Sequence, residues 1–180
     1  MRLKPRDVTV SAVFSVLTAL GAWISIPLPI TPVPVTLQVF FVLLSGAVLG
    51  ENLGALAQTI YLLLGLIGLP VFAGGESGPA VLIGPSGGYL FGFVAAAYLT
   101  GKLAGSNRGS SFVRMLIANL SGLIPIYLFG EIGLWVWLRS SLSVLLMVGV
   151  IPFLPIDVIK AIMAGYVGSR KQVRQLLQKK

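Results

Sequence analysis

The stretch YLLLGLIGLPVFAGGESGPAVLIGPSGGYLFGF, residues 61–93, determines how the chain is organised. It begins with an apolar run that ends at Pro70, and a second apolar run starts at Gly87. The loop between them is rich in glycine and proline. Within a membrane, non-helical backbone is tolerated only where protein buries it or where it lines a cavity. We therefore predict a helix, a structured loop and a second helix, with the loop forming part of the wall of a binding site.

The composition places this stretch in a membrane protein. The chain has 180 residues, of which 56% are hydrophobic and only 10% are charged, and its mean hydropathy is +0.96. A soluble domain carries about 25% charged residues. Because so few charges cannot cover a water-facing surface, we predict an all-α integral membrane protein that lies in contact with lipid.

Basic residues gather in three short segments that flank apolar runs. Eleven of the 13 basic residues lie in these segments: Arg2, Lys4, Arg6, Lys102, Arg108, Arg114, Arg170, Lys171, Arg174, Lys179 and Lys180. This is the pattern of cytoplasmic loops in membrane proteins. A nucleic-acid partner is not expected, because no basic stretch is interleaved with aromatic residues. The net charge of +8 therefore sets the orientation of the chain.

About six transmembrane helices fit the apolar runs, at residues 8–26, 35–50, 53–69, 86–103, 112–129 and 155–168. The first is predicted to be a retained span, although a basic start followed by an apolar run also resembles a signal peptide. An even number of spans places both termini in the cytoplasm. The whole chain, residues 1–180, is then a single transmembrane domain.

Three irregular segments fall on the outer side in this topology. The first, PLPITPVPVT at residues 27–36, is predicted to be an extended loop, because prolines remove hydrogen-bond donors. The second is the glycine-rich loop. The third surrounds Trp135, Trp137 and Arg139, where we expect a short interfacial helix or a re-entrant piece before the last span. Beyond the last span, Val173, Leu176 and Leu177 predict an extension of the helix along the membrane surface.

Asp157 and Lys160 carry the strongest chemical signal. They are three residues apart in a predicted helix and so share one face. Each charge costs about 2.5–3.5 kcal/mol at the centre of a span, which makes a functional role the default. Lys160 is predicted to hold a ligand carboxylate and Asp157 to accept hydrogen bonds from ligand N–H groups. The alternative is a structural ion pair.

Other residues are candidates for the same site. Tyr61, Phe72 and Tyr89 flank the glycine-rich loop, where aromatic rings suit either a flat ligand or the membrane interface. Two amides lie in apolar runs. Gln38 is as well suited to a ligand contact as to a hydrogen bond between helices, whereas we favour the latter for Asn119. Glu76 and Glu131 are predicted to be surface charges, with a pairing of Glu76 and Lys160 as the alternative.

Ser11, Ser15 and Ala19 lie at four-residue spacing on one face of the first span. Small residues at this spacing allow another helix to approach closely. That helix is either part of this protein or part of a partner.

Several chemistries have no support in the sequence. The chain contains neither cysteine nor histidine, which excludes disulfides and the usual zinc and haem ligands, so no cofactor or metal is expected. No phosphate-binding loop, G-x-S-x-G or H-E-x-x-H motif occurs. We therefore predict a protein that is not an enzyme.

Four blocks in order resemble the BioY family, the biotin-binding S components of energy-coupling factor (ECF) transporters. The blocks are PVPVTLQ (residues 32–38), YLLLGLIGLPVFAGG (61–75), GPSGGYLFGF (84–93) and PFLPIDVIK (152–160). The chain departs from the family at Ile156, where glycine is usual, and at Ser86, where threonine is common. Both charges of the last block are kept at the family spacing.

The resemblance implies a vitamin carrier in the plasma membrane of a prokaryote. An S component captures its vitamin outside and docks on a transmembrane coupling protein that carries two cytoplasmic ATPases. Ser11, Ser15 and Ala19 match the family's docking face, although alanine is more usual than the two serines. Asp157 would bind a ureido N–H of biotin and Lys160 its carboxylate, and Gly74 and Gly75 would let the loop approach the ring. Alternatives are an S component for another vitamin and a carrier that works alone.

Overall fold

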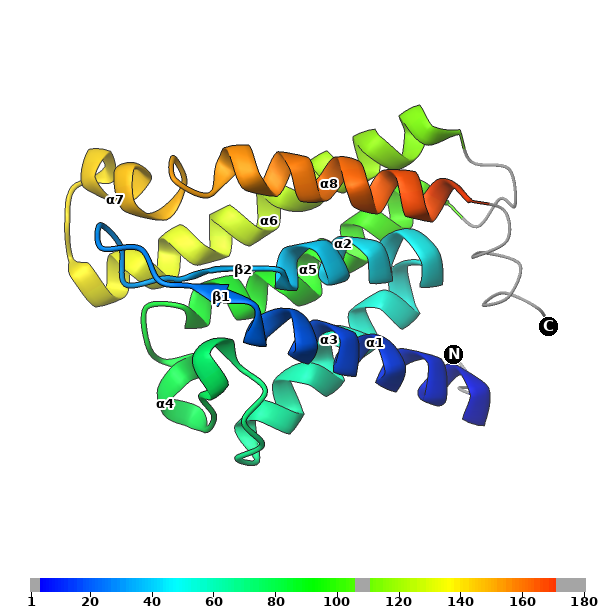
Figure 1. Cartoon of the computed structure of the whole chain (residues 1–180), viewed down its shortest axis with the longest axis horizontal. Helices are drawn as coiled ribbons and strands as arrows, with labels where there is room; N and C mark the ends of the chain where they lie inside the picture. Colours follow the sequence, from blue (N-terminus) through cyan, green and yellow to red (C-terminus); the bar gives the residue numbers. More distant parts are fainter. Residues whose placement is uncertain (1–3, 106–110, 171–180) are drawn as a thin grey trace.

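Helices that run side by side make up most of the protein (Figure 1). The computed structural model describes residues 4–105 and 111–170. Within these ranges the longer helices are α1 (Pro5–Trp23), α2 (Gln38–Leu49), α3 (Glu51–Leu66), α5 (Gly87–Ala104), α6 (Phe112–Leu138) and α8 (Leu154–Ser169). The shorter elements are β1 (Ser25–Ile26), β2 (Val35–Thr36), the 3-10 turn η1 (Ala73–Gly75), α4 (Pro79–Leu82) and α7 (Leu142–Gly149). The expected all-α class is therefore confirmed at the level of a mostly helical protein.

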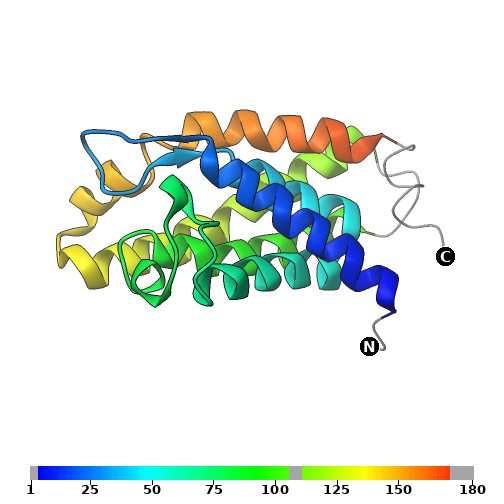
Figure 2. The same cartoon turned by 60° about the horizontal axis from the view of Figure 1, so that its bottom comes forward.

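Three connecting segments gather at one end of the bundle, which we call the loop end. They are the hairpin around residues 27–34, the loop after α3 at residues 67–86 and the segment of residues 139–153 (Figures 1 and 2). The first turn of α1 and the last turn of α8 lie at the opposite end. The predicted extended loop at residues 27–36 is a hairpin, because Ser25 pairs with Thr36 and Ile26 with Val35 in an antiparallel ladder. The predicted surface extension after residue 170 lies outside the described residues.

Helix α6 differs most from the prediction. Its apolar run was expected to stop at residue 129, but the helix continues to Leu138 despite Pro125 inside it. No proline or polar cluster interrupts residues 130–138. The helix ends only at Arg139, which adopts a left-handed conformation and whose N–H bonds to Trp135 O at 2.9 Å. Trp135 and Trp137 therefore belong to α6, and the short helix expected before the last span is α7, which meets α8 at a bend of 50°.

Glycines allow α5 and α6 to pack closely. A Cβ added at Gly92 would lie 2.9 Å from Ile126 Cα, and one added at Gly133 would lie 2.9 Å from Gly88 Cα. Such distances leave no room for a side chain, so these glycines serve helix packing. The result is a long and rigid contact between the two helices that carry Tyr89 and Tyr127.

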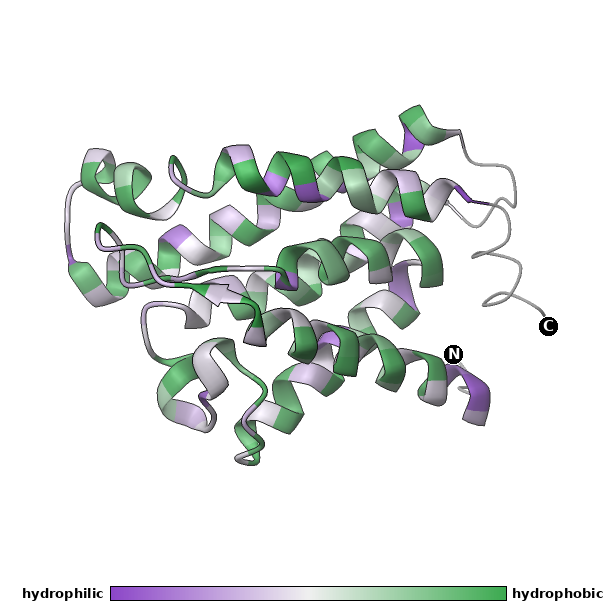
Figure 3. Cartoon of the chain, viewed as in Figure 1, coloured by the Kyte–Doolittle hydropathy of each residue, from purple (hydrophilic) through white to green (hydrophobic). Residues whose placement is uncertain are grey.

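Large apolar side chains cover the outside of the bundle, and several polar side chains lie inside it. Val16, Leu20, Ile124 and Ile159 are more than half exposed, whereas Gln58 is completely buried. Green colouring accordingly dominates the helices in Figure 3. An apolar surface of this extent marks contact with lipid or another apolar partner.

One helix in the described ranges, α6, is both long and apolar enough to cross a membrane alone. The bent pair of α7 and α8 passes the same test when it is taken as one span. The other long helices fall short of it in length or in mean hydropathy.

The face of α1 that carries Ser11 and Ser15 is inside the protein. Both side chains are completely buried, and the Ser11 hydroxyl donates to Leu53 O at 3.1 Å. Ala19 is only partly exposed. Because α1 packs on α2 and α3 along this side, the spacing of small residues serves contacts within the chain. The expectation that Ser11 and Ser15 face outward to a docking partner is therefore corrected, whereas the docking role of Ala19 stays a prediction.

Replacing Ser15 with phenylalanine should lower the stability of the protein, because the ring must enter the contact of α1 with its neighbours. Overpacking of this kind costs about 1–3 kcal/mol. Thermal unfolding of the detergent-solubilised protein measures the effect. Val16→Phe is the matched control, since Val16 is 53% exposed and its variant should unfold like the wild type. An unchanged midpoint for Ser15→Phe would contradict the buried position.

Candidate functional site

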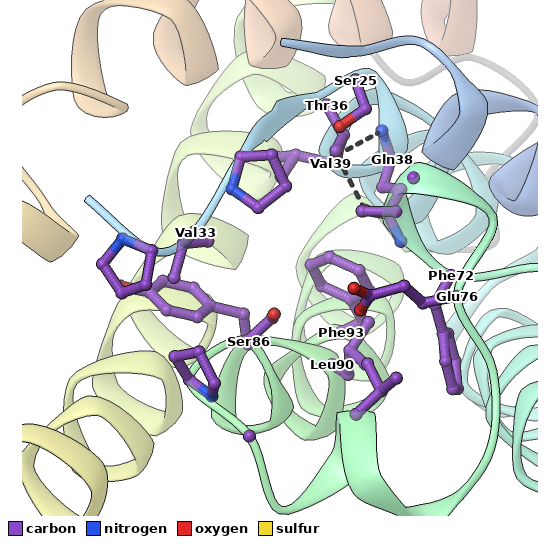
Figure 4. Close-up of a pocket in the computed structure, with 18 of the residues that line it drawn as sticks. Ser25, Val33, Thr36, Gln38, Val39, Phe72, Glu76, Ser86, Leu90 and Phe93 are labelled. Atoms are coloured by element: carbon purple, nitrogen blue, oxygen red, sulfur yellow. Dashed lines mark hydrogen bonds between the residues drawn. The ribbon is translucent and has the colours of Figure 1, made fainter. Parts of the chain in front are cut away.

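A cavity of about 1150 Å³ lies at the loop end of the bundle. Its wall combines the β1–β2 hairpin, the loop after α3 and the helices α2, α5, α6 and α8. Figure 4 shows labelled side chains of the hairpin, α2, the loop after α3 and α5 around a common space. This volume is slightly larger than the usual range for small-molecule sites, about 300–1,000 Å³. Seven of the eight predicted binding residues line it: Gln38, Phe72, Gly74, Gly75, Tyr89, Asp157 and Lys160.

Asp157 and Lys160 form a buried ion pair in the cavity wall. Lys160 Nζ lies 2.7 Å from Asp157 Oδ1, and the two residues are only 4% and 6% exposed. Pro155 in the first turn starts the helix, and the spacing of three residues then places both side chains on one face. The Tyr127 hydroxyl of α6 donates to the other carboxylate oxygen, Oδ2, at 2.8 Å. These three residues, which we call the polar triad, bring a donor and an acceptor together in an apolar bundle.

Gln38 lines the cavity from the first turn of α2, and its side-chain amide is held on both sides. The Thr36 hydroxyl donates to Gln38 Oε1 at 2.8 Å (Figure 4), and Gln38 Nε2 donates to the Tyr61 hydroxyl at 2.6 Å. Tyr61 in turn donates to Val71 O at 3.0 Å. Tyr61 itself is completely buried and lies behind the cavity wall. Its predicted place as an aromatic wall is therefore corrected to that of a support for Gln38 and the loop.

The glycine-rich loop is fixed to α3 by one aromatic ring. Phe72 is 1% exposed and its ring meets that of Tyr61 edge to face, with centroids 5.6 Å apart. A Cβ at Gly65 would overlap the Phe72 ring, so the glycine forms the notch that receives it. Gly74 and Gly75 follow with φ of 71° and 79°, a conformation that other residues adopt only with strain. The loop thus brings bare backbone to the cavity at these two positions.

Glu76 continues this loop as an exposed side chain that also lines the cavity (Figure 4). Its place agrees with the predicted surface charge. The alternative pairing with Lys160 is not formed, since the salt bridge of Lys160 is to Asp157.

Tyr89 connects the cavity to the segment before α8. Its hydroxyl lies 2.8 Å from Gly149 O and 3.2 Å from Glu131 Oε1. Glu131 is half-buried, and its other oxygen, Oε2, has no hydrogen-bond partner among the described residues. Glu131 thus lies at the loop end but is less exposed than a surface charge would be, because α6 continues past it and Gly149 of α7 lies against it.

Asn119 lies apart from the cavity, against Gly165 of α8. It is completely buried, and neither atom of its amide has a hydrogen-bond partner within the described ranges. The expected hydrogen bond between helices is therefore absent, although the contact of α6 with α8 at this point is real.

A family model for the BioY family matches residues 1–179. The chain belongs to the BioY family. Among its relatives, the biotin transporter BioY of Thermotoga maritima is 45% identical over 168 residues, covering 92% of this chain and 95% of the relative. The probable biotin transporter BioY of Pyrococcus horikoshii is 44% identical over 172 residues, covering 94% and 98%.

A solved structure agrees with this member of the BioY family over nearly its whole length. The crystal structure of the S-component for biotin from an ECF-type ABC transporter superposes with a TM-score of 0.80, covering 99% of this chain and 96% of that one. The two sequences are 29% identical. The similarity therefore extends to the whole bundle, including the loop end.

Two polar residues of the cavity were not predicted from the sequence. Thr36 and Tyr127 both line the cavity, and each bonds to a residue that was predicted. A tyrosine hydroxyl in the middle of an apolar span was the available signal for Tyr127, because a buried hydroxyl needs a partner. Among the described residues, no group of three or more acidic, cysteine or histidine side chains is placed to hold a metal ion.

Proposed function

We propose that this protein captures biotin and is the substrate-specific S component of an ECF-type ABC transporter. One observation carries the proposal: a cavity with a buried, hydrogen-bonded ion pair lies at the loop end of a BioY family member. Relatives that span almost the same length carry the name biotin transporter. The matching crystal structure is described as an S-component for biotin.

The ureido ring of biotin suits the polar triad. It presents N–H donors beside a carbonyl acceptor, and Asp157 and Lys160 present an acceptor beside a donor, 2.7 Å apart. A carboxylate has about four acceptor sites and an ammonium three donors, so both retain capacity for the ligand. In this arrangement Asp157 accepts from a ureido N–H and Lys160 donates to the ureido oxygen.

The contact of Lys160 with Asp157 argues against the predicted role of Lys160, which was to bind the carboxylate of biotin. The valerate chain separates the carboxylate of biotin from its ring, whereas the two charges of the pair are in direct contact. Lys160 would have to leave Asp157 in order to bind a carboxylate at the far end of the ligand. We therefore assign the pair as a unit to the ring.

The remaining wall suits the rest of biotin. Phe72, Leu90 and Phe93 are apolar and nearly buried, and they line the cavity together. They offer contacts to the sulfur-containing ring and to the valerate chain. Gln38 and the backbone at Gly74 and Gly75 supply further polar groups nearby.

The proposed topology has six transmembrane helices, α1, α2, α3, α5, α6 and α8, with both termini in the cytoplasm. Basic residues near the first turn of α1 and the end of α5 support it, because such residues favour the cytoplasmic side. The loop end and its cavity then face outside. The chain is one domain, residues 1–180, in the plasma membrane of a prokaryote.

The proposed partners are a transmembrane coupling protein and two cytoplasmic ATPases. The sequence supports this division of labour, because it contains no phosphate-binding loop of its own. The partially exposed and outward residues of α1, rather than the buried Ser11 and Ser15, are then available to the coupling protein.

Purified protein should bind biotin in preference to other vitamins. We expect thiamine and riboflavin to bind at least about 100-fold more weakly, because they would leave the buried pair without matching partners. Titration calorimetry in detergent measures all three affinities. Preference for another vitamin would move the proposal to an S component of different specificity, and no binding of biotin would contradict it.

Uptake of biotin should depend on the coupling module. Cells that produce this chain together with a coupling protein and its ATPases should accumulate labelled biotin, and cells that produce the chain alone should only bind it. An ATPase variant without its phosphate-binding lysine is the control for energy supply. Equal accumulation without the module would support a carrier that works alone.

A further inference from the structure

The carboxylate of Asp157 has two oxygens, and the structure gives each a different partner. Oδ1 receives Lys160 from the same helix at 2.7 Å, and Oδ2 receives the Tyr127 hydroxyl from α6 at 2.8 Å. Lys160 and Asp157 alone, at the start of one helix, would leave the plane of the carboxylate free to turn about its last bond. The second bond, from another helix, fixes that plane.

The position of Tyr127 is itself fixed. It lies two residues after Pro125 and next to Ile126, which are both buried against α5 at Gly92. That contact leaves no space for a side chain at Gly92, so the backbones of α6 and α5 lie directly against each other there. Tyr127 is half-buried and lines the cavity. The packing of α6 on α5 therefore fixes the position of the Tyr127 hydroxyl beside Asp157.

The bond has a directional consequence for the ligand. Because the Tyr127 hydroxyl donates its proton to Asp157, it uses one acceptor site of Oδ2, and Lys160 uses one of Oδ1. The acceptor sites that remain have fixed directions. A ligand N–H therefore finds them without first ordering the side chain, and this ordering would otherwise weaken binding.

We infer that Tyr127 is a positioning residue for ligand binding, which orients the Asp157 carboxylate toward the N–H donors of a cyclic urea in the cavity. This inference rests on the proposed function, because it takes biotin as the ligand. It assigns to Tyr127 a role through Asp157, and none that depends on a bond of its own to the ligand.

Tyr127→Phe tests the inference, since it keeps the ring and removes only the hydroxyl. The affinity for biotin should fall about tenfold, in line with loss of a hydrogen bond to a charged group. Tyr98→Phe is the matched control. Tyr98 lies on the outside of α5 and is 41% exposed, so its variant should bind biotin like the wild type.

A double-mutant cycle with Asp157→Asn separates positioning from other roles. The amide of asparagine no longer gives two acceptor oxygens, so adding Tyr127→Phe to it should cost less than about twofold. The affinities of weakly binding variants are measured by following the unfolding temperature as biotin is added up to millimolar concentration. If Asp157→Asn shows no binding even there, Asp157→Glu replaces it, because the longer side chain moves the carboxylate away from the Tyr127 hydroxyl. Adding Tyr127→Phe to Asp157→Glu should then also cost less than about twofold.

Three results would overturn the inference. An unchanged affinity of Tyr127→Phe with a lower unfolding temperature would make Tyr127 a structural residue only. If Tyr127→Phe lowered the affinity for biotin equally with Asp157 and with Asp157→Asn, Tyr127 would bond to the ligand directly. An unchanged affinity and an unchanged unfolding temperature would show that the bond to Asp157 has no role. Failure of the wild type to bind biotin would instead contradict the proposed function.

Discussion

The buried ion pair of Asp157 and Lys160 is the constraint on which the rest of the site depends. Removing two charges from water is costly, and their attraction offsets this only when the geometry is good and further hydrogen bonds are made. Here the 2.7 Å contact and the bond from Tyr127 supply both. The pair therefore requires α6 beside α8, and it keeps a polar surface inside an otherwise apolar bundle.

Irregular backbone is the second requirement of this site. The hairpin and the glycine-rich loop would expose unsatisfied backbone groups to lipid if they were not packed against protein. The loop is held by the Phe72 ring in the notch at Gly65 and by Tyr61 bonding to Val71 O. The Trp23 indole N–H adds a bond to Pro70 O at 3.0 Å. These contacts hold the glycine-rich loop in one conformation, in which it lines the cavity.

The sequence predicted those parts of the structure that depend on local rules. Spacing of three residues in a helix brought Asp157 and Lys160 together, and glycine and proline located the loop and the hairpin. Parts that depend on contacts between distant segments were not predictable in this way. The bond from Tyr127 to Asp157 joins residues 30 positions apart. Similarly, nothing local distinguishes a docking face from an internal one, and Ser11 and Ser15 proved to be internal.

The central claim is that Asp157 and Lys160 bind the ureido ring together, and Lys160→Ala tests it most directly when biotin and its uncharged methyl ester are compared. Loss of one partner of a buried charge pair should weaken both ligands on the order of 30-fold or more. Lys102→Ala, an exposed lysine of α5, should leave both affinities unchanged. Titration calorimetry of both variants with both ligands gives the answer. A loss confined to biotin, with the ester unaffected, would contradict the claim and place Lys160 at the carboxylate.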